Sequence, residues 1–508
     1  MKPLLEPPSH GGLGVERAHP GGAGPREACP WRERAHRAAA AVLATLASTV
    51  LLGCATPAAA PPTPAITQAS DLGAQPAAIV WPDARWWARY GDATLERLVD
   101  QALAGQPSLQ AVHARVRAAE AAVRGADAAR RPHGTLSADA TDQRFSENFI
   151  YPPPLAGSTR WTANAQAGAG WEIDLFGRQR AVLDAAIGQQ RAAQADAQAA
   201  RVLLASQVTA SYFNLARLIE ARTVASEALQ QREQVLGIVR ERIGAGLDTR
   251  VDLEQALGLV AQSKVQIETL GETIERTRHA LAELVGAGPQ AFDALTPALQ
   301  PIASFPVPAS LPADLLGRRA DLVAQRWRVE AALHDADAAR AQFYPNINLN
   351  AFIGLSSLGL NRLLDSGSLV YGAGPAIHLP LFDAARLQAN LDARRAEIDA
   401  SIAAYNGALL RALREVADEL SGLRSIERQQ RAQRDATAAA DAAHALALQR
   451  YRAGLGNFLV VLAAETNVLA QRLADTDLKA RHLASEVALV RALGGGFDGG
   501  WPQTTAAR

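Results

Sequence analysis

Apolar residues recur every three or four positions along two long stretches of this chain that contain no proline. The first lies between Pro154 and Pro289, and the second lies between Pro380 and Pro502. This spacing is typical of helices that pack as coiled coils, with Arg, Asp, Glu and Gln on the remaining faces. Such helices are roughly 100 Å long at about 1.5 Å per residue, and each needs neighbours to bury its apolar stripe. The stripes contain Leu204, Val208, Tyr212, Leu215 and Ile219, and then Ile402, Tyr405, Leu409, Leu413, Val416, Leu420 and Leu423.

Four shorter stretches have a different period, in which apolar and polar residues alternate. The alternation is strongest over 161–173, clear over 347–353, interrupted by Pro375 over 371–379, and weaker over 136–141. A period of two predicts β-strands with one face towards lipid and the other towards water. A soluble β-sandwich strand is the alternative explanation of any one of these stretches.

Two tryptophans mark the ends of the strongest strand. Trp161 and Trp171 lie ten positions apart on the same face. In a tilted strand they are roughly 25 Å apart, which matches the apolar band of an outer-membrane barrel between its aromatic girdles. Four strands cannot close a barrel, because the smallest membrane barrels use about eight. An open sheet in lipid leaves backbone groups unpaired, so the pattern predicts a barrel shared between several chains.

The chain also predicts an internal duplication. Arg242-Ile243-Gly244-Ala245-Gly246-Leu247 recurs as Arg450-Tyr451-Arg452-Ala453-Gly454-Leu455, each time as a glycine turn between two helical stretches. Other matched positions lie about 210 residues apart, so we place repeat one at about 86–288 and repeat two at about 313–497. They are Gln106-Pro107-Ser108-Leu109 with Arg319-Ala320-Asp321-Leu322, Pro132 with Pro345, and Leu175-Phe176-Gly177 with Leu381-Phe382-Asp383.

The N-terminal region predicts export and lipidation. Three arginines precede an apolar run over 38–52, which is long enough for a secretory signal and too short to span a bilayer. Cys54 follows Leu51-Leu52-Gly53, which resembles a bacterial lipoprotein signal, and Ala55 in place of aspartate points to the outer membrane. Two or three acyl chains on Cys54 would give stable anchoring, at about 0.8 kcal/mol per buried CH₂. A short buried helix with an incidental cysteine is the alternative.

These features divide the chain into four parts. Residues 1–53 form the signal region. The true translation start of the protein can lie downstream of Met1. Residues 54–80 form a lipidated tether rich in proline and alanine, residues 81–500 form the part with the strands and the long helices, and residues 501–508 form a tail.

Composition and motifs narrow the function. The chain has 51 basic and 51 acidic residues, so no net charge steers it towards nucleic acid. Cys29 lies in the predicted signal region, which leaves Cys54 without an intrachain partner. Gly354-Leu355-Ser356-Ser357 is not a nucleophile elbow, Gly244-Ala245-Gly246 is not a phosphate loop, and the histidines are scattered. We therefore expect no catalytic residue, no metal and no cofactor, with His378 a solvated polar residue.

Several short motifs, in their order along the chain, resemble those of the TolC-like outer membrane factors. This is the outer membrane efflux protein family, in its NodT-type lipoprotein branch. The resemblance runs from about Trp86 to Phe497 and includes Tyr90-Gly91-Asp92, Leu175-Phe176-Gly177, Leu316 to Leu322, Glu415-Val416-Ala417 and Tyr451 to Leu455. It implies an α+β membrane fold. Three chains supply four strands each to one 12-stranded β-barrel, which continues as a long, internally duplicated α-helical coiled-coil barrel across the periplasm.

The resemblance also implies partners and a function. A homotrimer in the outer membrane lipid would dock to a periplasmic adaptor (membrane fusion protein) and, through it, to an inner-membrane pump of the RND type. The function would be a passive exit duct for small molecules in tripartite efflux, with no chemistry of its own. The alternative is a coiled-coil scaffold lipoprotein that forms no channel, which leaves the alternating strands unexplained.

The resemblance places the two glycine turns at the periplasmic tip. The chain departs from several relatives by having Gly456 where they have a carboxylate, so an acidic constriction at the second turn is not assumed. Asp248 and Asp252 near the first turn are candidates, although solvated aspartates at a helix start explain them better. The predicted tip and docking residues are Arg242, Gly246, Leu247, Asp248, Arg450, Gly454, Leu455 and Gly456.

Overall fold

The computed structural model describes residues 57–59, 62–73, 81–299 and 315–499. The chain divides into a unit over 1–55 and a unit over 56–508, and all described residues belong to the second unit. Cys54, the predicted signal region and the tail lie outside the described residues.

The described chain runs through the same series of elements twice. The first series is α3 (Pro107–Ala129), β1 (His133–Arg144), β2 (Thr159–Ile173), α4 (Arg178–Gly244) and α5 (Arg250–Val285). The second series is α7 (Ala320–Ala341), β3 (Asn346–Leu358), β4 (Leu369–His378), α8 (Ala384–Arg452) and α9 (Phe458–Ala492). The predicted order of helix, two strands, long helix, turn and helix is confirmed.

Shorter elements precede each series. The short helix η2 (Trp86–Tyr90) leads into α2 (Ala93–Gly105), and α6 (Leu315–Arg318) precedes α7. Trp86 and Trp87 are both about 2% exposed, so this aromatic segment packs where α2 meets the long helices. The Asp92 side chain caps α2 by accepting hydrogen bonds from the backbone N–H groups of Thr94 and Leu95.

The two longest helices have 67 residues in α4 and 69 residues in α8. Both bury the predicted stripes, because α4 packs against α3, α5, α7 and α9, and α8 packs against α7 and α9. Leu215, Leu409, Val416 and Leu423 are fully buried. The helices are therefore stabilised mainly by packing of their apolar faces and not by isolated helical propensity.

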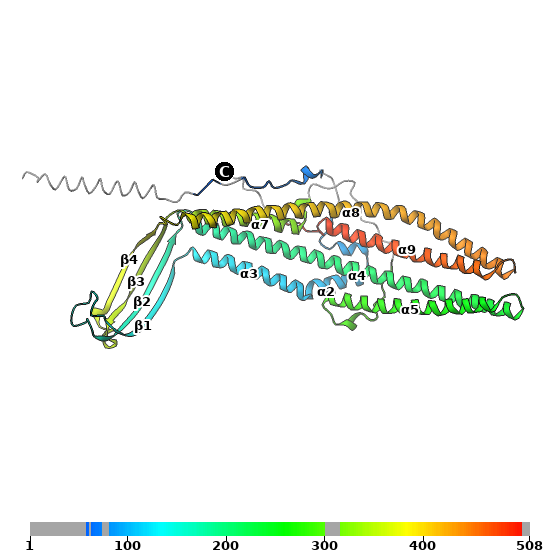
Figure 1. The fold of residues 1–508 in the computed structure, drawn as a ribbon, viewed down its shortest axis with the longest axis horizontal. Coiled ribbons are helices and arrows are strands. Elements are labelled where there is room, and N and C mark those ends of the chain that lie inside the picture. Colours follow the sequence, from blue (N-terminus) through cyan, green and yellow to red (C-terminus); the bar gives the residue numbers. More distant parts are fainter. Residues whose placement is uncertain (1–56, 60–61, 74–80, 300–314, 500–508) are drawn as a thin grey trace, which may run out of the picture. The chain divides into compact units, whose positions relative to one another are not determined.

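The four strands form one antiparallel sheet in the order β1-β2-β3-β4. All four predicted strands are confirmed, and Pro375 lies inside β4, an edge strand, where a missing backbone donor is tolerated. Within the described residues no helix covers either face of this sheet (Figure 1). The outer edges of β1 and β4 have no strand partner in the described protomer.

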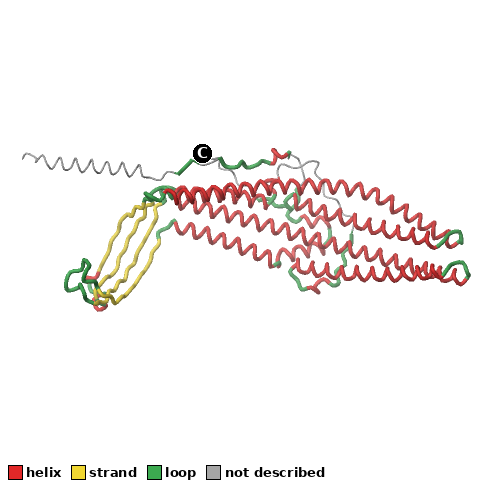
Figure 2. Tube along the Cα trace, in the orientation of Figure 1, coloured by secondary structure: helices red, strands yellow, loops and turns green. Residues whose placement is uncertain are grey.

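The sheet and the helical turns lie at opposite ends of the second unit. Figure 2 shows the strands gathered at one end and the two helical hairpins, α4 with α5 and α8 with α9, reaching to the other. The strands are thus far from the glycine turns that join each pair of helices.

Candidate functional site

The two glycine turns at the helical end have the same backbone structure. Gly246 and Gly454 have φ values of 72° and 77°, which side chains other than glycine rarely adopt. The N–H of Leu247 donates to the carbonyl of Arg242 at 2.9 Å, and the N–H of Leu455 donates to the carbonyl of Arg450 at 2.9 Å. Each turn therefore closes its helix in the same way, with a left-handed glycine and a hydrogen bond back to the last helical turn.

The first turn is tied to the second by a compact polar network. Arg242 binds Asp248 through two hydrogen bonds, from Nε at 3.0 Å and from Nη2 at 3.1 Å. Its Nη1 donates to the backbone carbonyl of Tyr451 at 3.1 Å, and its guanidinium lies 4.5 Å from the centre of the Tyr451 ring. The Tyr451 hydroxyl completes the network by donating to Asp248. We call Arg242, Asp248 and Tyr451 the tip lock.

The tip lock is shielded from water and keeps its donors protonated. Tyr451 is fully buried, and the Arg242 and Asp248 side chains are 13% and 8% exposed. Hydrogen bonding to Asp248 raises the pKa of Arg242, and burial together with the hydrogen bond to Asp248 raises the pKa of Tyr451. The expectation that Asp248 is a solvated aspartate is wrong, because the fold brings Tyr451 from the other hairpin onto it.

The second turn lacks this network. Gly456 occupies the place of Asp248, and Arg450, the counterpart of Arg242, is exposed. Leu247 and Leu455 are 64% and 71% exposed, so both turns present an apolar side chain to the surroundings.

Asp252 has a different role from Asp248. It forms a capping box with Thr249 at the start of α5, and the hydrogen bonds from Thr249 lower the pKa of its carboxyl. The expectation of a helix-start aspartate therefore fits Asp252.

A second buried polar cluster, which no sequence pattern predicted, links three helices further from the turns. Arg232 of α4 pairs with Glu465 of α9 at 2.7 Å and donates to the Ser263 hydroxyl of α5 at 2.8 Å. The Arg232 and Glu465 side chains are 8% and 4% exposed. An apolar cluster of α4, α5, α8 and α9 includes Tyr451 of the tip lock. It is formed by Val235, Leu236, Val239, Ala256, Val260, Ala447, Tyr451, Phe458 and Val461.

At the other end, the strand register divides the sheet into one apolar face and one polar face. Residues that lie opposite one another in a sheet share a face. The register places Ala163 opposite Ala140 and Ser357, and it places Ile353 opposite Ala167 and Tyr371. This face is mainly apolar, with Asp142 and Ser357 as its polar members. Its apolar members are Leu136, Ala138, Ala140, Trp161, Ala163, Ala165, Ala167, Ala169, Trp171, Ile347, Leu349, Ala351, Ile353, Leu355, Leu369, Tyr371, Ala373 and Ile377.

Both predicted girdle tryptophans lie on this apolar face. Trp161 is 46% exposed and Trp171 is 39% exposed, and the indole N–H of Trp171 donates to the backbone carbonyl of Arg130 at 3.0 Å. The opposite face carries hydrogen-bonded polar side chains, since Asn164 donates to Asp139 at 2.9 Å and accepts from Ser356 at 2.8 Å. His378 lies on this polar face, as expected.

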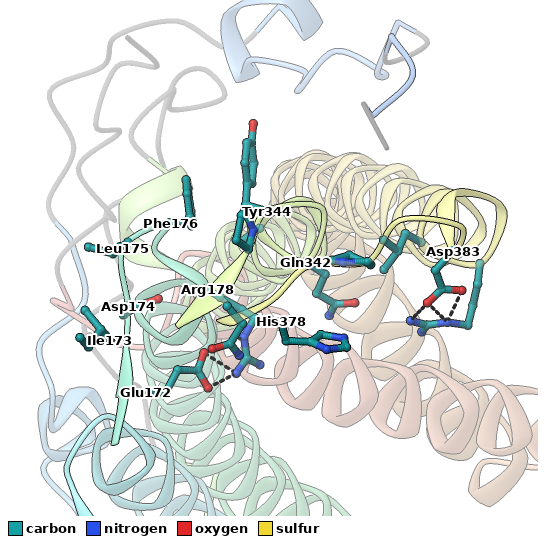
Figure 3. Close-up of a pocket in the computed structure, with 16 residues that line it drawn as sticks. Glu172, Ile173, Asp174, Leu175, Phe176, Arg178, Gln342, Tyr344, His378 and Asp383 are labelled. Carbon is teal, nitrogen blue, oxygen red and sulfur yellow. Dashed lines mark hydrogen bonds and ion pairs between the residues drawn. The ribbon is translucent and has the colours of Figure 1, made fainter. Parts of the chain in front are cut away.

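The junction between the sheet and the long helices holds a small pocket (Figure 3). Glu172 at the end of β2 pairs with Arg178 at the start of α4, with a closest approach of 2.6 Å. The Phe176 and Tyr344 rings stack with centres 4.8 Å apart and planes 11° apart. These contacts link the end of β2 to the start of α4 and to the segment that precedes β3.

Among the helices that the structure describes, none is both long and apolar enough to cross a bilayer.

Comparison with known proteins gives a consistent result. The sequence profile of the outer membrane efflux protein family matches residues 98–287 and 311–495. The chain is 31% identical to the multidrug resistance outer membrane protein MdtP of Escherichia coli over 83% of this chain and 88% of that protein. It is 33% identical to the outer membrane protein OprJ of Pseudomonas aeruginosa over 82% of this chain and 87% of that protein. The crystal structure of the outer membrane protein VceC of Vibrio cholerae superposes with a TM-score of 0.78 at 35% identity, and it covers 82% of this chain and all of VceC.

Proposed function

The chain belongs to the outer membrane efflux protein family, and on that premise we propose that it is the passive exit duct of a tripartite efflux system. The observation that carries the proposal is the single-layer sheet with one apolar and one polar face, joined directly to a bundle of very long helices. A duct needs an apolar outer wall in lipid, a polar inner wall and a long extension towards the pump.

Three protomers complete the duct. A four-stranded sheet with open edges would leave unpaired backbone groups in the bilayer, each costing several kcal/mol. Three copies supply twelve strands and close one barrel, whose polar faces line the lumen. The long helices then surround a continuous passage through the periplasm.

The resting duct is closed at its helical tip. The tip lock and the buried Arg232–Glu465 pair hold the α4/α5 hairpin against the α8/α9 hairpin in each protomer. Opening requires these hairpins to separate or slide, which contact with the adaptor would favour over the closed arrangement.

Planar-bilayer recording of the purified trimer tests the duct and its closure together. We expect small conductance from the unaltered protein and a severalfold increase from Tyr451→Phe and from Asp248→Asn. The first removes the hydroxyl that donates to Asp248, and the second removes the negative charge that binds Arg242. Asp252→Asn is the matched control, since that carboxylate caps a helix near the same turn without joining the hairpins. Absence of conductance from every variant, with intact trimer, would leave the coiled-coil scaffold as the better function.

The exposed leucines of the two turns are the proposed adaptor contact. Leu247 and Leu455 lie beside the predicted docking residues Arg242, Gly246, Arg450, Gly454 and Gly456. We expect Leu247→Glu or Leu455→Glu to lower drug tolerance of the cell while the level of trimer in the outer membrane stays unchanged. Unchanged tolerance in both variants would place the docking surface elsewhere. An inner-membrane pump of the RND type is the proposed source of the exported small molecules.

Lipid anchoring at Cys54 is supported by the path of the segment that follows it. Residues 57–59 and 62–67 lie along α8, because Ala58 bonds with Gln388 and Arg395, and Asn406 bonds with the backbone of Ala65 and Thr67. Gln388 lies close to the start of α8, next to the strands. Cys54 precedes Ala58 by four residues, so at most about 14 Å of extended chain separates the two.

Mass spectrometry of the mature protein tests this anchoring. We expect Cys54 to be the first residue and to carry two or three acyl chains. Cys54→Ala should remove that mass while the barrel still holds the trimer in the membrane. An unmodified Cys54 inside a longer mature chain would contradict the proposal.

The proposed duct performs no reaction. The residues at the tips and the lumen face would guide and gate passage, and no step needs a nucleophile, a metal or a cofactor. The energy for export would come from the pump.

A further inference from the structure

A polar cavity lies at the end of the sheet that is remote from the long helices. The loop over residues 359–368, which joins β3 to β4 at this end, bounds the cavity together with the polar face of β1, β2 and β3 (Figure 1). The cavity has a volume of about 790 Å³. Its charged and amide side chains are those of Asp139, Gln143, Asn164, Arg362 and Asp365. The proposed exit duct gives this cavity no role.

The loop between β3 and β4 is held in place by hydrogen bonds to its backbone. The N–H of Gly359 donates to the carbonyl of Trp161 on β2 at 2.6 Å, and Gly359 has a φ of 95°, which favours glycine. The buried Ser368 hydroxyl donates to the carbonyl of Arg362 at 2.7 Å. These bonds fold the loop over the end of the sheet, so that Arg362 and Asp365 line the cavity.

The opposite wall of the cavity carries a carboxylate that the sheet holds in position. The Asn164 amide donates to Asp139 at 2.9 Å and accepts from the Ser356 hydroxyl at 2.8 Å. One chain of side-chain hydrogen bonds therefore crosses β1, β2 and β3. Gln143 and Arg160 lie opposite each other further along the same polar face. Charges of both signs thus lie on this face of the sheet and in the loop above it.

The charges that line the cavity do not neutralise one another. In the part of the chain that the structure describes, Arg362 forms no ion pair with Asp139 or Asp365. At the other end of the sheet, by contrast, Glu172 and Arg178 pair directly, with a closest approach of 2.6 Å. A guanidinium and two carboxylates that share a cavity without pairing can each bind a separate charge of one small molecule, through charge-assisted hydrogen bonds.

We propose that this cavity is a subsite for small zwitterions, molecules that carry both an ammonium group and a carboxylate, at the outer mouth of the lumen. Asp139 and Asp365 bind the ammonium group, and Arg362 binds the carboxylate. The proposal rests on the proposed duct and deepens it by naming a class of exported molecule. Exposed ion pairs are weak, so a bound molecule leaves readily, as passage through an exit requires.

Three forms of one tripeptide test this assignment. At pH 7, triglycine carries both charges, N-acetyltriglycine carries only the carboxylate, and triglycinamide carries only the ammonium group. Saturation-transfer NMR on the purified trimer measures their relative affinities. We expect triglycine to bind about two- to fivefold more tightly than either derivative, because each derivative loses one exposed ion pair.

Variants then connect each charge of the ligand to a side chain. Arg362→Gln should lower the affinity for triglycine about two- to fivefold without weakening triglycinamide, which has no carboxylate. Asp365→Asn should weaken triglycine and triglycinamide without weakening N-acetyltriglycine. Asp139→Asn should do the same, but it also alters the bond to Asn164, so Asp365→Asn separates binding from folding. Asp142→Asn is the matched control, because it removes a carboxylate of the same strand from the opposite face.

The outcomes separate this proposal from the proposed function. Equal binding of the three tripeptides, or a preference for triglycine that persists in trimers of both Arg362→Gln and Asp365→Asn, overturns the subsite, while bilayer conductance of the unaltered protein upholds the duct. If no bilayer variant conducts although the trimer prefers triglycine, the duct is overturned and zwitterion binding stands.

Discussion

At the scale of single residues, the duplicated tips differ at the positions that carry polar chemistry. The two turns share their glycines and backbone bonds, yet Asp248 in the first is replaced by Gly456 in the second. One carboxylate therefore serves both hairpins by binding Arg242 from its own turn and Tyr451 from the other. Loss of Asp248 would leave a buried tyrosine hydroxyl without its acceptor, which is costly in a water-poor site.

The Arg232–Glu465 pair should contribute strongly to the stability of the helical tips. Glu465→Gln is expected to lower the free energy of unfolding by about 3–5 kcal/mol, because it leaves the Arg232 charge buried without its partner. Thermal unfolding of the purified trimer measures the effect. The double variant Arg232→Met and Glu465→Leu should recover most of the loss, and a double variant as unstable as Glu465→Gln would contradict this account.

His482 of α9 should make stability depend on pH near neutrality. Its side chain lies 3.2 Å from Glu486, and the hydrogen bond to Glu486 raises its pKa above the ordinary 6.5, aided by the charge of Glu427. The folded protein thus favours protonated His482. The contribution of this group to folding stability is fully present below pH 6.5 and is lost as the pH rises through the raised pKa. As the pH rises from 6.5 through the raised pKa, the melting temperature of His482→Gln should fall less than that of the unaltered protein. Parallel curves would show that His482 does not contribute.

At the scale of elements, close helix packing depends on small residues at particular crossings. A Cβ added at Gly188 of α4 would lie 2.9 Å from the Cβ of Ala331 in α7, closer than carbon atoms normally approach. This crossing joins the two repeats within one chain, and it sets how tightly α4 and α7 can approach.

Gly188→Ala should therefore destabilise the protomer by about 1–3 kcal/mol, because α4 and α7 must move apart. Gly237→Ala in the same helix is the control, since nothing lies within 4 Å of an added Cβ there. The control should be neutral or stabilising by about 0.5–1 kcal/mol, because alanine favours helix. Equal effects of the two substitutions on chemical unfolding would argue against close packing at Gly188.

At the scale of the whole molecule, one face of the sheet is mainly apolar and the other mainly polar across four strands that come from both repeats. Asp142 and Ser357 are polar exceptions on the first face, and Phe352 and Val370 are apolar exceptions on the second. Alternation along one strand is a local property, but agreement of four strands on a common face requires the correct register at three pairings. That agreement is what makes the sheet a wall between lipid and water.

Arginine substitutions on the two faces should have opposite consequences. Ala167→Arg places a charge on the apolar face midway between Trp161 and Trp171, where it is expected to cost about 2–4 kcal/mol in the bilayer. Gln166→Arg, on the polar face, should leave the trimer in the outer membrane. Membrane fractionation and mild gels measure trimer levels, and a tolerated Ala167→Arg would show that this face does not contact lipid.

The sequence by itself determined the elements, because periods of two and of three to four are local patterns that read directly as strands and helices. It also determined the duplication, the glycine turns and the family, since motifs keep their order along the chain. Tertiary structure alone decided which charges meet. Asp248 and Tyr451 are 203 residues apart, and Arg232 and Glu465 are 233 residues apart. No local pattern distinguishes these residues from solvated charges, because their burial and pairing arise only when two hairpins from different repeats pack together.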